Sequence, residues 1–128
     1  MLDGILESVS LDVNFTAGND FSSQMETVAK MMKTKDSRGS DRDVFYVEIP
    51  GFDTHRDLNQ LFGKLLSSVN LGIEEFKGAM VDEGLWDSVT IVMVSEFGRT
   101  LQENTGNGTD HGKCICVFLI VYLACNNE

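Results

Sequence analysis

A long helical pattern between two short apolar runs constrains the fold of this chain more than any other feature. After Asp57, apolar side chains recur every three or four residues as far as Met80, which predicts one amphipathic helix over residues 57–83. The runs DVFYVEI (43–49) and SVTIVMVS (88–95) predict a strand on each side of it, with apolar residues on both faces. Strand, helix and strand in this order predict a right-handed βαβ unit with parallel strands, and hence an α/β fold.

The remainder of the chain is expected to contribute less regular structure. Residues 1–20 are acidic and show no firm element. Ser23 and Glu26 resemble a capping box, and the apolar side chains that follow predict a helix over 22–35. The apolar tail, 113–128, could form a strand or could equally be an exposed aggregation hazard. Unless residues 115–124 add a strand beside the other two, open sheet edges would favour marginal stability or self-association.

Charge and composition exclude several function classes. Among 128 residues, 20 are acidic and 10 basic, and the net charge of −10 disfavours nucleic acids and anionic membranes as partners. The sequence shows no signal peptide and no apolar run of the ~20 residues that a membrane helix needs, so the cytoplasm is the default location. Cys114, Cys116 and Cys125 crowd one apolar segment, which predicts buried free thiols over a disulfide, redox or metal site.

Polar clusters follow both predicted strands. GFDTH (51–55) comes after the first strand and SEFGR (95–99) after the second. Because the carboxyl ends of parallel strands meet at one edge of a sheet, these clusters are expected to lie together. GTDHG (108–112) stands in a loop rich in glycine and asparagine that can fold back over the same edge. The sequence therefore predicts that its two histidines, His55 and His111, converge on one place.

The side chains of these clusters belong to the ligand types that Zn²⁺ and Mn²⁺ take in proteins. Thr54 and Thr109 are candidates for hydrogen bonds to such ligands. Arg99 offers a planar pair of donors that suits phosphate or sulfate oxygens, which makes it the candidate catalytic residue. With a metal ion, Arg99 would suit the hydrolysis of an oxyacid ester. The candidate metal ligands are Asp53, His55, Glu96, Asp110 and His111.

Each cluster also has an interpretation that needs no metal. Asp53 could accept backbone N–H groups and so cap its own loop. Glu96 and Arg99 could form a simple surface ion pair at the start of a helix. Asp110 could belong to ordinary turn chemistry in GNGTD. Residue types leave these alternatives open, whereas the convergence of three clusters favours a common site.

The order of these motifs resembles the C-terminal part of domain-of-unknown-function family 1501, which is grouped with the alkaline-phosphatase-like and sulfatase superfamily. The resemblance covers about residues 21–112, and its pieces are QMETVAKMM, RDVFYVEIPGFDTHRDLNQ, LLSSVNLGIEEFKGAMVDEGLWDSVT and VSEFGRTLQENTGNGTDHG. It implies a fragment of a three-layer α/β/α sandwich with a mainly parallel sheet, a partial domain at 21–112 and an atypical tail at 113–128. Relatives are often exported, which leaves the location open.

The resemblance also implies functional residues and ligands. Asp53 and His55 would form one ligand group, Glu96 would stand where the superfamily often places an acidic ligand, and Asp110 with His111 would complete the set. The implied cofactor is divalent Zn, Mn or Ca, and the implied substrate is a small phosphate or sulfate ester. The part of such a domain that carries the nucleophile is expected to be missing. The prediction is therefore a fragment of a metal-dependent hydrolase-like domain that has lost activity; the alternative is a non-catalytic binding module or the relic of a truncated gene.

Overall fold

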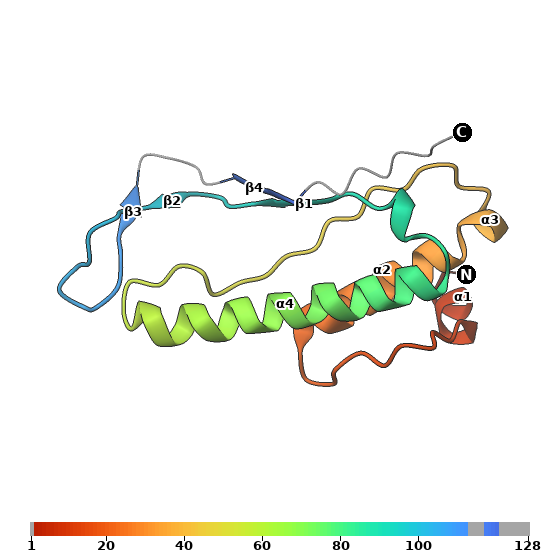
Figure 1. The fold of residues 1–128 in the computed structure, drawn as a ribbon, viewed down its shortest axis with the longest axis horizontal. Helices are drawn as coiled ribbons and strands as arrows, with labels where there is room; N and C mark the ends of the chain where they lie inside the picture. The colour runs from red at the N-terminus through yellow and green to blue at the C-terminus, as the bar shows by residue number, and fades with distance from the viewer. Residues whose placement is uncertain (1, 113–116, 121–128) are drawn as a thin grey trace. The chain divides into compact units, whose positions relative to one another are not determined.

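The computed structural model describes residues 2–112 and 117–120 (Figure 1). The chain divides into two compact units: residues 1–49 with 67–86, and residues 50–66 with 87–128. The elements, in chain order, are α1 (Leu2–Ser8), α2 (Asp20–Lys33), α3 (Lys35–Arg38), α4 (Leu58–Asp82), a 3-10 turn (Trp86–Ser88), β1 (Ile91–Val94), β2 (Gly98–Arg99), β3 (His111–Gly112) and β4 (Val117–Ile120).

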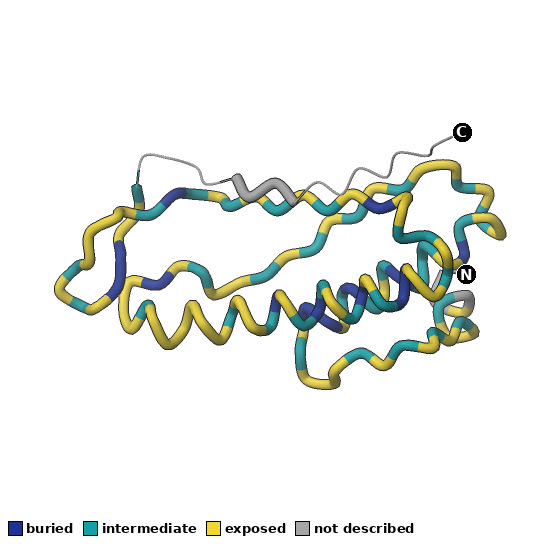
Figure 2. The backbone as a smooth tube through the Cα atoms, in the orientation of Figure 1, coloured by how far each residue is buried: buried dark blue, intermediate teal, exposed yellow. Residues whose placement is uncertain are grey.

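The core of the first unit is formed by α2 and the C-terminal part of α4. Figure 2 shows buried positions along both helices. Gly72 of α4 permits a close approach, because a Cβ atom there would lie only 2.5 Å from the ring of Phe21. The buried apolar side chains of these two helices are Phe21, Met25, Ala29, Val69, Phe76, Ala79 and Met80.

The helix predicted at 22–35 is present, but it begins at Asp20 and its cap is not Ser23. The side chain of Asn19 accepts hydrogen bonds from the backbone N–H groups of Phe21, at 3.1 Å, and Ser22, at 3.3 Å. Asn19 is held in turn by the hydroxyl of Ser68 in α4, which donates to Asn Oδ1 at 2.8 Å. Asn19 therefore satisfies the N–H groups that the first turn of a helix leaves free.

The long helix predicted at 57–83 is confirmed as α4, Leu58–Asp82. Gly84 follows its C-terminal end, and the φ of 66° at this residue is the left-handed conformation that glycine adopts without strain. Leu85 N–H then donates to the carbonyl of Met80 at 2.8 Å and closes the last turn. Within the described part of the chain, no helix, α4 included, is both long and apolar enough to span a membrane.

Residues 43–49 do not form the strand that the sequence predicts. They belong to neither a helix nor a strand, and the side chains of Val44 and Tyr46 are 94% and 85% exposed. The backbone of Glu48 bonds to the side-chain amide of Gln24 instead, with N–H donating at 3.2 Å and C=O accepting at 3.0 Å. An extended run becomes a strand only beside a partner, and here a side chain takes that place.

The strands of the second unit pair antiparallel, so the predicted parallel βαβ unit is not found among the described residues. β1 pairs with β4, with Ile91 opposite Ile120, and β2 pairs with β3, with Arg99 opposite His111. The structure is thus a mixture of helices and small antiparallel sheets, which agrees with α/β only coarsely. β1 also exposes one face, because Val92 and Val94 are 56% and 65% exposed.

Predictions for the two ends of the chain have different outcomes. Residues 1–20, where no firm element was expected, contain the short helix α1. The strand that the sequence leaves possible in the tail is present at Val117–Ile120 as β4, which pairs with β1. The three cysteines, at 114, 116 and 125, lie outside the described residues, and so does the prediction about their thiols.

Candidate metal centre

The candidate site lies in the second unit, where the loop between β2 and β3 is fastened to the segment that leads into α4. Thr109 N–H donates to the carbonyl of Thr54 at 3.1 Å. Asp57 N–H donates to Gly106 at 3.3 Å, and Leu58 N–H donates to Asn107 at 3.0 Å. The N–H groups of Asp57 and Leu58 stand at the start of α4, where backbone N–H groups find no acceptor within the helix itself. Backbone hydrogen bonds therefore hold the two histidine-bearing segments together.

Gly108 makes this close approach possible. A Cβ atom at residue 108 would lie 2.2 Å from the carbonyl carbon of His55 and 2.5 Å from the nitrogen of Arg56. No side chain larger than hydrogen fits at such distances, so glycine is required there for steric reasons. Gly106 and Gly108 thus allow the loop before His111 to lie against the backbone of His55.

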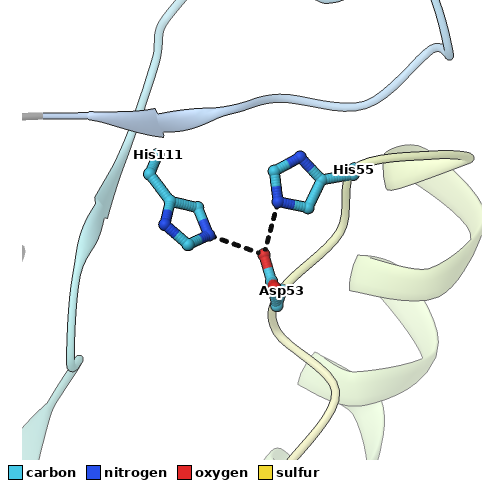
Figure 3. Close-up of side chains that lie close together, drawn as sticks. All are labelled: Asp53, His55 and His111. Carbon is cyan, nitrogen blue, oxygen red and sulfur yellow. Dashed lines mark hydrogen bonds and ion pairs between the residues drawn. The ribbon is translucent and has the colours of Figure 1, made fainter.

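Asp53 lies between the two histidines. Its Oδ1 atom is 3.0 Å from Nε2 of His55 and 3.0 Å from Nε2 of His111. Figure 3 shows both imidazoles turning a nitrogen toward this one oxygen. One ligand atom from each of the three residues lies within 4.8 Å of the others, and all three residues are exposed. The predicted convergence of the histidines is therefore what the structure shows.

Arg99 fixes Asp53 from another side. Its Nη1 donates to Asp53 Oδ1 at 2.7 Å, its Nε donates to the Thr109 hydroxyl at 2.7 Å, and its Nη2 donates to the Thr109 carbonyl. The hydrogen bond from Arg99, followed by that from His111, holds the pKa of Asp53 below its usual range. Arg99 pairs with Asp53, not with Glu96 as a surface ion pair would require.

Asp110 contacts the opposite side of the His55 ring. Its Oδ1 atom is 2.9 Å from His55 Nδ1 and 3.0 Å from the amide nitrogen of Asn104. These two contacts, with Asn104 the larger cause, lower the pKa of Asp110. Sequence reasoning missed Asn104, although an asparagine before two glycines in NTGNG is a recognisable turn signal.

Glu96 and Phe97 differ in their relation to the site. Glu96 was predicted as a ligand, but it is not part of the three-residue group among the described residues. Its neighbour Phe97 stacks on the ring of His111, with centroids 4.0 Å apart and an interplanar angle of 19°. The phenyl ring thereby restricts His111 on one face. An aromatic residue in this role carries no sequence signal that would separate it from a core residue.

A polar hollow of about 650 Å³ opens beside the cluster. Arg56, Asp57 and the loop at 104–107 line the hollow. His55 and Asp110, which are in contact with each other, line it as well. Thr54 is buried between Asp53 and His55, and its hydroxyl has no hydrogen-bond partner among the described residues. The cluster thus adjoins a space that could receive a small polar ligand.

Two imidazole nitrogens and one carboxylate oxygen form a donor set that fits Zn²⁺ or Mn²⁺. Ca²⁺ prefers six to eight oxygen ligands, so this set fits it poorly. Three protein ligands would leave coordination positions open for water or substrate, as in catalytic metal sites.

Comparison with known proteins places this chain in a family. No curated protein and no solved structure matches the chain significantly. The family model DUF1501, described as "protein of unknown function", matches residues 7–120 and so extends beyond the expected 21–112 at both ends. Because the match covers most of the chain, the protein belongs to the DUF1501 family.

Proposed function

We propose that this chain is a metal-binding module that holds one Zn²⁺ or Mn²⁺ ion through Asp53, His55 and His111. The observation that carries the proposal is the meeting of their ligand atoms within 4.8 Å of one another. Asp53 and His111 are 58 positions apart in the sequence. Backbone hydrogen bonds between residues 54–58 and 106–109 bring them together.

The interpretations without a metal account less well for the contacts. Side-chain nitrogens of three residues contact the Oδ1 atom of Asp53, whereas a residue that caps a loop would bind backbone N–H groups. Turn chemistry explains Asn104, whose side chain accepts from Gly106 N–H and Gly108 N–H, but it does not explain the meeting of two imidazoles.

Hydrolysis of a phosphate or sulfate ester is the activity that the site would support. A bound divalent ion would supply a Lewis acid that polarises the ester and neutralises its charge. Arg56, which lines the hollow, is placed to bind an anionic group, and Arg99 orients Asp53. The hydroxyls nearest in sequence are poorly placed as nucleophiles, because Thr54 and Thr109 are buried and Thr109 accepts from Arg99. Metal binding therefore ranks before catalysis in this proposal.

The predicted three-layer sandwich belongs to the same proposal. In the first unit, Val44 and Tyr46 expose apolar side chains from extended backbone; in the second unit, Val92 and Val94 do the same. Exposed apolar side chains that gather on a surface commonly mark a place that another part of a protein covers. We infer that further strands and helices cover these residues in a complete α/β/α domain of which this chain is a part.

Metal titration of the purified, chelator-stripped chain tests the proposal. Calorimetry with Zn²⁺ and Mn²⁺ is expected to give one site per chain, and elemental analysis should recover one equivalent after dialysis. His55→Ala and His111→Ala should each abolish binding. Glu96→Gln is the matched control, and it should retain the ion because Glu96 lies outside the three-residue group.

The outcomes separate the alternatives. Absence of binding, or binding that both histidine substitutions leave intact, would refute the site. Loss of binding in Glu96→Gln would restore Glu96 as a ligand, as the sequence predicted. Turnover of p-nitrophenyl phosphate or sulfate that depends on the added metal would extend the function from binding to hydrolysis.

A further inference from the structure

We infer that Asp110 is a positioning residue and not a metal ligand: held by Asn104, it fixes the ring of His55 so that Nε2 is presented to the ion. This inference rests on the metal site proposed above and assigns a different role to one residue of the predicted ligand set. It also gives a role to Asn104, which the sequence did not identify as part of the site.

The two nitrogens of His55 face different carboxylates. Nε2 lies 3.0 Å from Asp53, inside the three-residue group, whereas Nδ1 lies 2.9 Å from Asp110. The nitrogens of an imidazole diverge across the ring, so an ion at Nε2 does not share the position of Asp110 beside Nδ1. A carboxylate that accepts from the second N–H of a ligating histidine is a recurring feature of metal sites.

Proton counting favours the same arrangement. A neutral imidazole has one N–H, and a carboxylate can only accept, so His55 without a metal cannot satisfy both contacts while it is neutral. With an ion at Nε2, the single proton of the neutral ring resides on Nδ1 and donates to Asp110. The contact with Asp110 therefore selects the tautomer that metal binding requires.

Asn104 holds Asp110 in place and has little freedom itself. Its amide nitrogen donates to Asp110 Oδ1 at 3.0 Å and to the carbonyl of His55 at 3.1 Å. Its amide oxygen accepts from Gly106 N–H at 2.9 Å and from Gly108 N–H at 3.0 Å. The donors and acceptors at both ends fix which way the amide is turned. Asn104 thus links the loop, the carboxylate and the backbone of His55.

His111 is held by different means. Its Nε2 faces Asp53, and its ring stacks on Phe97 at 4.0 Å. The effect of removing Asp110 should therefore fall on His55 and leave the ring of His111 in place. This asymmetry allows a local positioning role to be separated from general damage to the site.

The test compares Asp110→Ala and Asp110→Asn with Glu103→Ala, which removes an exposed carboxylate from the same loop. Zn²⁺ affinity is measured by calorimetry, and the ring nitrogens of His55 are observed by ¹⁵N NMR with and without Zn²⁺. Asp110→Ala is expected to weaken binding about 10- to 100-fold and to remove the fixed Nδ1–H tautomer. Asp110→Asn keeps an oxygen that can accept from Nδ1–H, so it should recover part of the affinity. Glu103→Ala should behave as the wild type.

Three results would overturn the inference. If both Asp110 variants abolish binding as completely as His55→Ala does, Asp110 is a ligand. If Asp110→Ala binds Zn²⁺ as tightly as the wild type and His55 keeps its tautomer, Asp110 has no positioning role. A wild-type chain that binds no Zn²⁺ refutes the proposed function as well, whereas the first two results leave that function standing. Asp110→Asn, which is nearly isosteric, provides the comparison if Asp110→Ala does not fold.

Discussion

Arg99 and Asp53 form an ion pair in which Nη1 lies 2.7 Å from Oδ1, the same carboxylate oxygen that faces both histidines. The arginine side chain is only 18% exposed. Three of its five N–H groups are engaged by Asp53 and Thr109. In this geometry the arginine orients Asp53, a ligand of the proposed metal site, whereas the sequence predicted a role in catalysis.

Replacement of Arg99 should therefore change metal affinity. Arg99→Lys retains a positive charge but not the planar fork, so it cannot reproduce the three hydrogen bonds. We expect Arg99→Lys and Arg99→Gln to weaken Zn²⁺ binding about tenfold or more, as loss of a group that orients a ligand does. Calorimetry provides the measurement, with the exposed Arg42→Lys as the control. Unchanged affinity with reduced ester turnover would instead support the catalytic role.

Gly108→Ala should disrupt the loop that carries His111. The added methyl group would meet backbone atoms of His55 at 2.2–2.4 Å, and backbone cannot move aside as a flexible side chain can. We expect a loss of about 1–3 kcal/mol in the free energy of unfolding, as for overpacked sites, together with weaker metal binding. Gly63→Ala in α4 meets nothing within 4 Å and should stabilise the helix by up to about 1 kcal/mol. Equal effects of the two substitutions would argue against the close approach.

Asn19→Ala should lower the free energy of unfolding by about 1 kcal/mol, because it removes the side chain that caps α2. Ser23→Ala, which removes the cap that the sequence predicts, should change it by less than about 0.5 kcal/mol. Urea denaturation followed by circular dichroism measures both. A larger loss for Ser23→Ala would restore the capping box.

The ion pair between Arg38 and Asp43 should make stability depend on pH. Arg38 Nη2 lies 2.5 Å from Asp43 Oδ2 and Ser40 donates at 2.8 Å, and these bonds, Arg38 first, hold the pKa of Asp43 below its ordinary value of 3.8. The folded state thus favours the ionised carboxylate. This contribution is complete above the unfolded pKa and is lost as the pH falls below 3.8 through the folded pKa.

Denaturation at pH 7 and at about pH 3 checks this sign. Asp43→Asn should lose less stability on acidification than the wild type, because it has no carboxylate to protonate at this position. Asp41→Asn, a neighbouring exposed acid for which no ion pair is found among the described residues, should follow the wild type. Greater acid sensitivity in Asp43→Asn would contradict the assignment.

The exposed apolar face of residues 43–49 should promote self-association. Val44 and Tyr46 lie in a segment that pairs with no strand among the described residues, and such a segment can pair with another chain. Sedimentation velocity of the wild type should therefore depend on concentration, and Val44→Lys with Tyr46→Lys should shift the protein toward the monomer. Leu101→Lys removes an equally exposed apolar side chain from a loop and serves as the control. A wild-type chain that is monomeric at all concentrations would contradict this prediction.

Sequence reasoning was most accurate where structure depends on near neighbours. The periodicity of α4 and its stop at Gly84 are local features, and both are observed. The cap of α2 was misassigned because Asn19 is stabilised by Ser68, which is distant in the sequence. Residues 43–49 were misassigned because β-branched and aromatic residues favour extended backbone but do not supply a partner strand.

The convergence of the histidines was predicted by a different route from the one observed. The prediction relied on the ends of parallel strands, whereas the structure uses the β2–β3 hairpin and backbone bonds from its loop to residues 54–58. Ligand types can be read from residue names, which is why Asp53 was among the candidates. The orientation of a ring by Asn104 or Phe97 depends on three-dimensional contacts and could not be read in the same way.

The hydrogen bonds from Asp57 and Leu58 to the carbonyls of Gly106 and Asn107 join the first turn of α4 to the histidine loop. Opening of that turn would release the loop. An ion that binds only the closed loop would raise the free energy of this opening, and the increase is larger for an ion that binds more tightly. The exchange of these two amide protons with deuterated solvent should therefore slow when Zn²⁺ is added. The beginning of a helix would then report the occupancy of a site whose three proposed ligands all lie outside that helix.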